Sequence, residues 1–420
     1  MKKALLSAFR AAVNIADPER TTRAALASLT PPCGRVVVIS VGKAAMGMAR
    51  AALAWNPEAR GVVVTPKNVV TSEETGSPAT FPLVIFRAGH PTPNEGSVLA
   101  AQATLTAVAS LSRHDLVLAL LSGGGSALLS APMGLSLAEK QVVTRELLAC
   151  GASIQELNAV RKHLSLIKGG RLAVASAPAT LCTVVISDVV GDDVSTIASG
   201  PTAPDWTTFR DAMAVLDHYQ IRAPAARRVL AAGEDGLYPE TPKAGDPAFD
   251  RSEFLVAASN RAALAAAVAD LERRGLKVKL CDDAVTGESD AAGAEHAARA
   301  LTLKAGTGFC SGGETTVTVR GPGRGGRNLQ FALSLAVNLR GAPGVWAILA
   351  DTDGIDGGSH AAGAIVMPDT LERANKLGLD ATEMLAANNA HAFFAALGDL
   401  VVTGPTGTNV NDLRVIVREP

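Results

Sequence analysis

The chain has 420 residues, with 39 basic and 40 acidic side chains and a formal net charge of −1. This balance provides no long-range attraction for nucleic acid or an anionic membrane, so we expect neither as a partner. The five cysteines are scattered and form no CxxC pair, which disfavours both a disulfide framework and a zinc site.

The N-terminal segment pairs Lys2 and Lys3 with an apolar stretch that Arg10 soon interrupts. This pattern predicts an amphipathic first helix rather than a signal peptide. The longest apolar runs are strand-sized and too short to span a membrane. We therefore expect a soluble, cytoplasmic protein.

Apolar runs that end in Gly or Asp alternate with helical patterns through the first half of the chain. Such runs are typical of strands buried on both faces of a parallel sheet, and the alternation is βαβ order. The predicted strands are 35–42, 61–66, 83–89, 115–125 and 180–191, and the predicted helices are 94–112, 136–150 and 153–167. The first half is predicted to be a doubly wound α/β domain.

A polar stretch rich in proline, residues 201–253, predicts a domain boundary near 235–250. We therefore expect an N-terminal domain over 1–240 and a smaller C-terminal α/β domain over 241–420. The strands predicted after the boundary are 254–260, 277–283, 307–321, 345–357, 399–404 and 412–419, with helices between them, one over about 326–339.

Ligands of open α/β sheets bind beyond the carboxyl ends of the strands, so candidate site residues follow the predicted strands. Lys43 follows the first strand at the start of a helix, where a cation suits a phosphate or carboxylate. A solvated lysine is the alternative interpretation. After the fourth strand, a glycine-rich loop exposes backbone N–H groups that suit an oxyanion. Its residues are Ser122, Gly123, Gly124, Gly125 and Ser126.

Asn158, Arg161 and Lys162 share one face of the helix predicted over 153–167. The usual interpretation of such a face is contact with solvent, and phosphate binding is the alternative. Acidic residues follow two strands in different halves of the chain, and such oxygen ligands suit Mg²⁺ with a substrate phosphate. They are Asp188 and Asp193, then Asp351 and Asp353.

The segment 321–326 matches GxGxxG between a strand and a helix, which favours a rival class, the dinucleotide-dependent oxidoreductases. That fingerprint has an acidic residue ~20 residues after the glycines, which binds the ribose. Asp351 lies later than this, which weakens the match. Arg324 and Arg327 place cations where such folds use mainly backbone. Arg327 followed by Asn328 at a helix start suits a transferring phosphoryl group better.

Taken together, these segments resemble the glycerate 2-kinase family, also called type II glycerate kinase or the MOFRL family. The matching segments run in the family's order and are VGKAAMGMA, GHPTPNEGS, LLSGGGSALL, LNAVRKHLSLIKGGRLA, VISDVVGDDVSTIASGPT, SGGETTVTVRGPGRGGRNLQFAL, ADTDGIDG and VVTGPTGTNVNDL. The resemblance implies an N-terminal Rossmann-like domain and a smaller C-terminal α/β domain flanking a cleft. It also implies ATP-dependent phosphorylation of D-glycerate to 2-phosphoglycerate.

Carried over by motif, the resemblance assigns phosphoryl transfer to Lys43 and Arg327. As a hypothesis, Asp188 or Asp193 binds magnesium or orients the 2-hydroxyl. ATP and Mg²⁺ are the expected cofactors of a monomer or homodimer. The residues expected on the nucleotide side are Gly312, Gly313, Glu314, Thr315, Asn328, Thr406, Gly407 and Asn409. Similar proteins are sometimes labelled hydroxypyruvate reductase, so an NAD(P)H-dependent reductase that uses 321–326 stays open as the alternative.

Overall fold

The computed structural model describes residues 1–67 and 82–420, which form two compact units. The first unit is Pro18–Ala257, and the second combines Met1–Asp17 with Ala258–Pro420. Two six-stranded sheets form within the described residues. In this part of the chain, no helix combines the length and apolar character needed to cross a membrane.

The first sheet has the strand order β3-β2-β1-β4-β5-β6, the order of doubly wound dinucleotide-binding folds. Its strands are β1 (Val36–Val41), β2 (Arg60–Pro66), β3 (Leu83–Ala88), β4 (Leu116–Leu121), β5 (Thr180–Ile186) and β6 (Ser252–Ala258). The pairings that join β3, β2, β1, β4 and β5 are all parallel. Both β1 and β4 are buried at every position, which explains their near-continuous apolar sequences.

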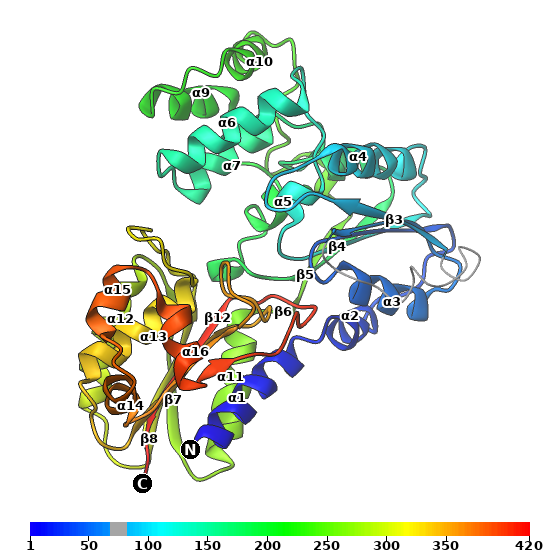
Figure 1. Ribbon diagram of the computed structural model, residues 1–420. Coiled ribbons are helices and arrows are strands. Elements are labelled where there is room, and N and C mark those ends of the chain that lie inside the picture. The colour runs from blue at the N-terminus through cyan, green and yellow to red at the C-terminus, as the bar shows by residue number, and fades with distance from the viewer. Residues whose placement is uncertain (68–81) are drawn as a thin grey trace. The chain divides into compact units, whose positions relative to one another are not determined.

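Helices cover both faces of this sheet. The helices of the first unit are α2 (Pro18–Leu26), α3 (Ala45–Trp55), α4 (Glu95–Val108), α5 (Gly125–Leu128), α6 (Leu137–Ala149), α7 (Ile154–His163), α8 (Arg171–Ser176), α9 (Phe209–His218) and α10 (Pro224–Glu234). Figure 1 shows α4 on one face of the sheet and α2 and α3 on the other. The helices α6, α7, α9 and α10 enclose a separate apolar core that includes Leu147, Val160, Phe209 and Leu230.

The second sheet has the order β11-β10-β9-β12-β8-β7. Its strands are β7 (Lys277–Val285), β8 (Thr307–Gly313), β9 (Val345–Asp351), β10 (Gly363–Val366), β11 (Leu400–Val401) and β12 (Asp412–Arg418). Only β7 and β8 pair in parallel, and the other neighbours among these strands pair antiparallel. The last strand therefore lies inside the sheet, between β8 and β9.

The helices of the second unit are α1 (Lys2–Ile15), α11 (Asn260–Glu272), α12 (Ser289–Leu301), α13 (Arg327–Leu339), α14 (Thr370–Lys376), α15 (Ala381–Ala386) and α16 (Ala390–Leu397). Figure 1 shows α1 and α11 side by side on one face of the sheet, with α12 and α13 on the other. The apolar face of α1 buries Leu5 and Phe9, which confirms the predicted amphipathic first helix.

The structure assigns three elements differently from the sequence prediction. The segment 254–260 was expected to open the second domain, but its strand β6 adds to the first sheet beside β5. The first helix joins the second unit, and the two units divide after Ala257. The short strand β10 was not predicted. Periodicity identifies a strand but not the sheet that it joins, and four residues give little pattern to detect.

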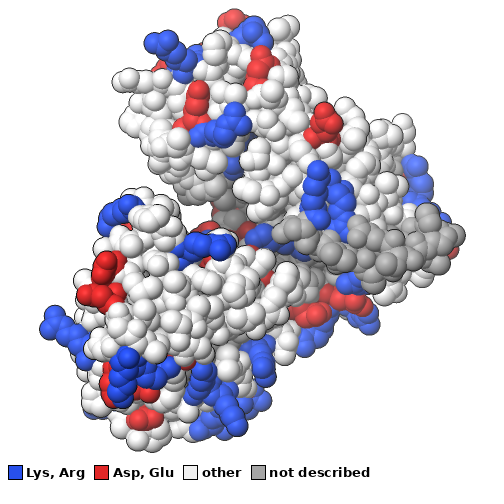
Figure 2. All heavy atoms as spheres, in the orientation of Figure 1, with Lys and Arg blue, Asp and Glu red and all other residues white. Residues whose placement is uncertain are grey.

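The distribution of charged side chains on the surface agrees with the near-neutral net charge of the sequence. On the face shown in Figure 2, basic and acidic side chains lie interspersed between broad uncharged areas. This face offers no continuous field of one sign, so electrostatic recognition has to act locally, within the sites described next.

Candidate functional site

The loops after β1 and β4 meet at the carboxyl ends of these neighbouring strands. From β1 the chain continues to β2 and β3 on one side, and from β4 to β5 on the other, so this is the switch point where such sheets bind ligands. The backbone N–H of Lys43 donates to the Gly123 carbonyl at 2.9 Å. Gly42 has a φ of +130°, and a Cβ there would lie 2.1 Å from Ser122 Oγ, so only glycine fits this approach.

A chain of hydrogen bonds fixes the glycine-rich loop to the rest of the first unit. Ser126 Oγ lies 2.7 Å from Ser199 Oγ, and Ser199 Oγ donates to Asn158 Oδ1 at 2.9 Å. The ammonium of Lys168 donates to the Ser126 carbonyl at 2.8 Å and to the Leu129 carbonyl at 3.1 Å. The structure therefore brings the loop together with the predicted helix-face residue Asn158.

The polar face of α7 is buried, so the interpretation as a solvated face is wrong. Asn158 and Lys162 are only 3% and 5% exposed. Lys162 Nζ lies 3.0 Å from Asp205 Oδ1, and this carboxylate is itself buried. Burial raises the pKa of Asp205, but the charge of Lys162 and its hydrogen bond outweigh burial and lower it. Lys162 thus has a structural partner, whereas the half-buried Arg161 has no carboxylate partner among the described residues.

The two acidic residues predicted after β5 differ in their surroundings. The carboxylate of Asp193 accepts hydrogen bonds from Ser195 N at 2.9 Å and from Thr196 Oγ1 at 2.8 Å. These bonds shape the loop that leads to Ser199. Asp188 lies half-buried just beyond the end of β5.

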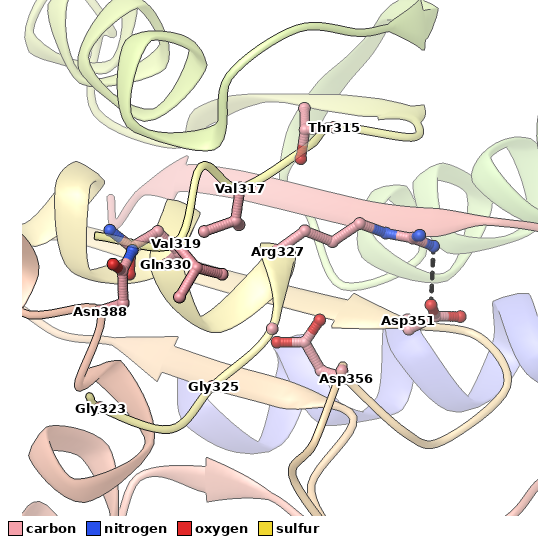
Figure 3. A pocket seen from close by; sticks show the side chains of 12 residues that line it. Thr315, Val317, Val319, Gly323, Gly325, Arg327, Gln330, Asp351, Asp356 and Asn388 are labelled. Atoms are coloured by element: carbon pink, nitrogen blue, oxygen red, sulfur yellow. Dashed lines mark hydrogen bonds and ion pairs between the residues drawn. The ribbon is translucent and has the colours of Figure 1, made fainter. Parts of the chain in front are cut away.

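In the second unit, Arg327 begins α13 and is held by three carboxylates. Its Nε lies 2.9 and 3.0 Å from the two Asp412 oxygens, its Nη2 lies 2.8 Å from Asp351 Oδ2, and its Nη1 pairs with Glu314. Figure 3 shows the guanidinium extending toward Asp351. Burial on its own would lower the pKa of Arg327. The charges of Asp412, Asp351 and Glu314 outweigh burial, so the pKa lies above its usual value. Arg327 is therefore permanently charged and fixed in position.

Asp412 and Asp356 organise the start of α13. The fully buried Asp412 accepts from Asn328 Nδ2 and from Arg414 Nη2, both at 2.7 Å. Asp356 accepts from the backbone N–H groups of Asn328 and Leu329 at 3.0 and 2.8 Å, so it caps the helix. Burial is the main cause that raises the pKa of Asp356 to about 6.

A cavity of about 270 Å³ lies beside Arg327. Figure 3 shows Val317 and Val319 on one side of it, with Arg327 and Asp356 opposite. It is lined by Thr315, Val317, Val319, Gly323, Gly325, Gly326, Arg327, Gln330, Asp351, Asp356, Gly357 and Asn388. An apolar wall facing charged groups suits a ligand with an apolar part and an anionic part.

Of the residues expected on the nucleotide side, Thr315 lines this cavity. Glu314 is not a lining residue, but it forms an ion pair with Arg327, which is one. Gly312 and Gly313 end β8, where they pair with β12. Thr406 Oγ1 donates to the Thr352 carbonyl at 2.6 Å, so the loop that also holds Gly407 and Asn409 packs against the turn after β9. All these residues belong to the second unit, and that they bind a nucleotide stays a prediction.

The residues present do not fit a magnesium ion held by the protein alone. Within residues 1–67 and 82–420, no group of three or more His, Cys, Asp or Glu side chains is placed to hold a metal. Asp351 Oδ1 accepts from Asp353 N at 3.0 Å, and its other oxygen binds Arg327. The carboxylates around Arg327 have suitable oxygen atoms, but the guanidinium occupies the place of a cation among them. No ligand set for magnesium is therefore assigned.

The segment 321–326 lacks the structural context of a dinucleotide fingerprint. It follows β8 only after an extended loop, and β12 runs antiparallel between β8 and β9. Added Cβ atoms at Gly321 and Gly323 would lie 2.4 and 2.5 Å from the Ala387 carbonyl oxygen. Packing against this neighbouring segment explains both glycines without a bound pyrophosphate.

Several residues of the site were missed from the sequence, among them Asp412 in its central role, Asp356 as a helix cap, and the cavity residues Gln330 and Asn388. Asp356 carried a signal, because it lies in the acidic segment ADTDGIDG that follows a predicted strand, where site residues are expected. The role of Asp412 could not be read from the sequence, because its partner Arg327 lies 85 residues earlier in the chain.

The fold and these loops define an α/β protein whose polar groups gather after the strands of a doubly wound sheet, the arrangement of many small-molecule enzymes. Family models describe two parts of the chain: residues 4–232 match a domain of unknown function, DUF4147, and residues 307–412 match the MOFRL family. The chain belongs to the glycerate 2-kinase family, whose C-terminal part is the MOFRL domain.

Curated relatives and solved structures cover nearly the full length. The chain is 36% identical to a D-glycerate 2-kinase of Thermotoga maritima over 99% of this chain and 98% of the relative. It is similar, with a TM-score of 0.87 and 36% identity, to the crystal structure of a glycerate kinase of that organism, covering 99% of each chain. An Agrobacterium vitis protein provisionally named hydroxypyruvate reductase is 47% identical over 99% of this chain and 94% of its own length. The glycerate kinases among these relatives support a kinase.

Proposed function

We propose that this protein transfers the γ-phosphoryl group of ATP to the 2-hydroxyl of D-glycerate and so forms 2-phosphoglycerate and ADP. The observation that carries the proposal is the end-to-end similarity to a D-glycerate 2-kinase. Arg327 enters the proposal as the residue that the resemblance assigns to phosphoryl transfer, a reaction that depends on positioned positive charge more than on covalent chemistry.

In this reaction the 2-hydroxyl oxygen bonds to the γ-phosphorus, and the bond from that phosphorus to the β–γ bridging oxygen breaks. The hydroxyl proton leaves to a base or to solvent, and Asp188 is the proposed orienting carboxylate. Lys43 and the loop Ser122–Ser126 hold an anionic group at the switch point of the first sheet. Arg327 neutralises charge on the phosphoryl group. Mg²⁺ belongs to the proposal as the ion that accompanies ATP.

Replacing either proposed cation should remove transition-state stabilisation. Arg327→Ala and Lys43→Ala are each expected to lower kcat by ~10²-fold or more. Arg324→Ala is the matched control, because Arg324 lies three residues before Arg327 and its side chain donates a long 3.5 Å bond to a carbonyl. Steady-state kinetics with D-glycerate, ATP and Mg²⁺ measures the difference. Near-normal turnover by Arg327→Ala removes this residue from the mechanism.

The reductase names of the Agrobacterium relatives favour a second candidate, reduction of hydroxypyruvate with NAD(P)H. The geometry of 321–326 does not support it, since its glycines are explained by packing. One pair of assays separates the candidates. A kinase releases ADP only when D-glycerate is present, whereas a reductase consumes NADH or NADPH when hydroxypyruvate is added.

A further inference from the structure

Three cationic side chains lie close together beside the glycine-rich loop. Lys140 is 4% exposed and donates to the Leu164 carbonyl at 3.0 Å, while Lys168 is 2% exposed and donates to two carbonyls of the loop and its helix. The third is Arg161 of α7. Within the described part of the chain, none of the three has a carboxylate partner.

The local electrostatics confirm that these cations repel each other. Burial, followed by the charge of Arg161, lowers the pKa of Lys140 to about 7. Burial, then the charges of Lys140 and Arg161, lowers the pKa of Lys168. Burial lowers the pKa of Arg161 to about 10. By contrast, Lys162 on the same helix is matched by Asp205. A buried group of cations without an acid is stabilised by an anionic ligand.

Asn158 provides a second, independent observation. It lies three residues before Arg161 on α7, which places both side chains on one face of the helix. Its Oδ1 accepts from Ser199, but its buried Nδ2 has no hydrogen-bond partner in the described residues. Buried amide donors are rarely left unpaired, because an unmet donor costs about 1–3 kcal/mol. Asn158, with Arg161 one helical turn further on, therefore lies on the face of α7 that meets Ser199, whose hydroxyl is bonded to that of Ser126.

We propose that Arg161 and Asn158 bind the carboxylate of the acceptor substrate and that the partly exposed Ser126 contacts one of its hydroxyl groups, while the buried Ser199 holds Asn158 and Ser126 in place. The proposal rests on the proposed function and assigns its acceptor subsite. A guanidinium fork with a neighbouring amide matches the planar carboxylate of a small hydroxy acid. The buried Lys140 and Lys168 donate to backbone carbonyls, so neither is proposed to contact the ligand directly. The site therefore selects anionic acceptors over neutral polyols.

The test compares two acceptors with the same three-carbon skeleton: D-glycerate, which has a carboxylate, and glycerol, which has none. Arg161→Ala should raise the KM for D-glycerate roughly 10- to 100-fold, the effect of losing a hydrogen-bonded charge, and leave the KM for ATP unchanged. The preference in kcat/KM for D-glycerate over glycerol should fall by the same factor. Asn158→Ala should show a smaller rise, and Arg161→Lys an intermediate one. Arg145→Ala is the matched control, since Arg145 is exposed on neighbouring α6.

Calorimetric titration of D-glycerate gives a readout that does not depend on turnover. Wild-type protein should bind D-glycerate, and Arg161→Ala should bind it roughly 10- to 100-fold more weakly. A thermal melt close to that of wild type shows that the variant is folded. If the wild type binds D-glycerate through Arg161 but transfers no phosphoryl group, the proposed function fails while the subsite stands. Unchanged binding and KM in Arg161→Ala, or a rise in the KM for ATP alone, overturns the subsite.

Discussion

At the scale of single residues, the structure changes the view of Arg327. The sequence predicts that Arg327 lies at a helix start and that its cation faces a phosphate. The structure confirms the helix start, because Arg327 is the first residue of α13. Its three carboxylate partners could not be predicted, because Asp412 comes from a strand 85 residues later that inserts antiparallel beside β8. Asp412 and Asp351 are buried, whereas the side chain of Glu314 is 51% exposed. The three partners should therefore contribute unequally to stability.

Asp412→Ala is expected to destabilise the second unit by ~3–5 kcal/mol, because it leaves the buried Arg414 without its carboxylate. Glu314→Ala is the matched comparison at the same guanidinium and should cost no more than ~1 kcal/mol, since its ion pair is exposed to water. Urea denaturation followed by circular dichroism measures both. Equal losses for the two variants contradict the assignment of Asp412 as the buried centre.

Asp356 gives a prediction about pH. Its pKa rises from 3.8 in the unfolded chain to about 6 in the folded protein. The folded state therefore binds this proton more tightly, and the contribution to stability is complete below pH 4 and is lost as the pH rises through 6. Asp356→Asn should flatten the dependence of the unfolding free energy on pH between about 4 and 6. A pH series of urea melts tests this, and an unchanged slope counts against the raised pKa.

At the scale of elements, buried strands were the most predictable part of the fold. The strands β1, β2, β4 and β9 begin or end within a few residues of the predicted ranges, since each contains a short run of mostly apolar residues. Sheet membership was less predictable. The segment 254–260 was expected in the second domain but contributes β6 to the first sheet, and β12 was not expected at the centre of its sheet. Such pairings depend on contacts that are distant in sequence.

The attachment of α1 to the second unit is a testable consequence of this packing. Phe9 is 1% exposed in the apolar face that meets α11, so Phe9→Ala should cost ~3–5 kcal/mol. Hydrogen exchange should become faster in α11 and the second sheet but not in β1 or β4. Arg10→Ala, at the exposed neighbouring position, should change stability by less than ~0.5 kcal/mol. Faster exchange in β1 instead would show that α1 supports the first unit.

At the scale of the whole molecule, the candidate site residues are divided between two units with separate cores. The glycine-rich loop, Lys43 and the proposed acceptor subsite belong to the first unit, and Arg327 with its cavity belongs to the second. The sequence predicted the α/β class, the doubly wound first sheet and the family. That residues of both units serve one reaction stays a prediction, because no periodicity or motif reports how two folded units act together.

The most direct test follows the product itself. Purified protein is incubated with ATP, Mg²⁺ and D-glycerate, and ³¹P and ¹H NMR spectra identify the phosphorylated carbon. We predict equal amounts of ADP and 2-phosphoglycerate. A 3-phosphoglycerate product would contradict the proposed position of transfer, and intact ATP together with NAD(P)H-dependent loss of hydroxypyruvate would contradict the proposed reaction altogether.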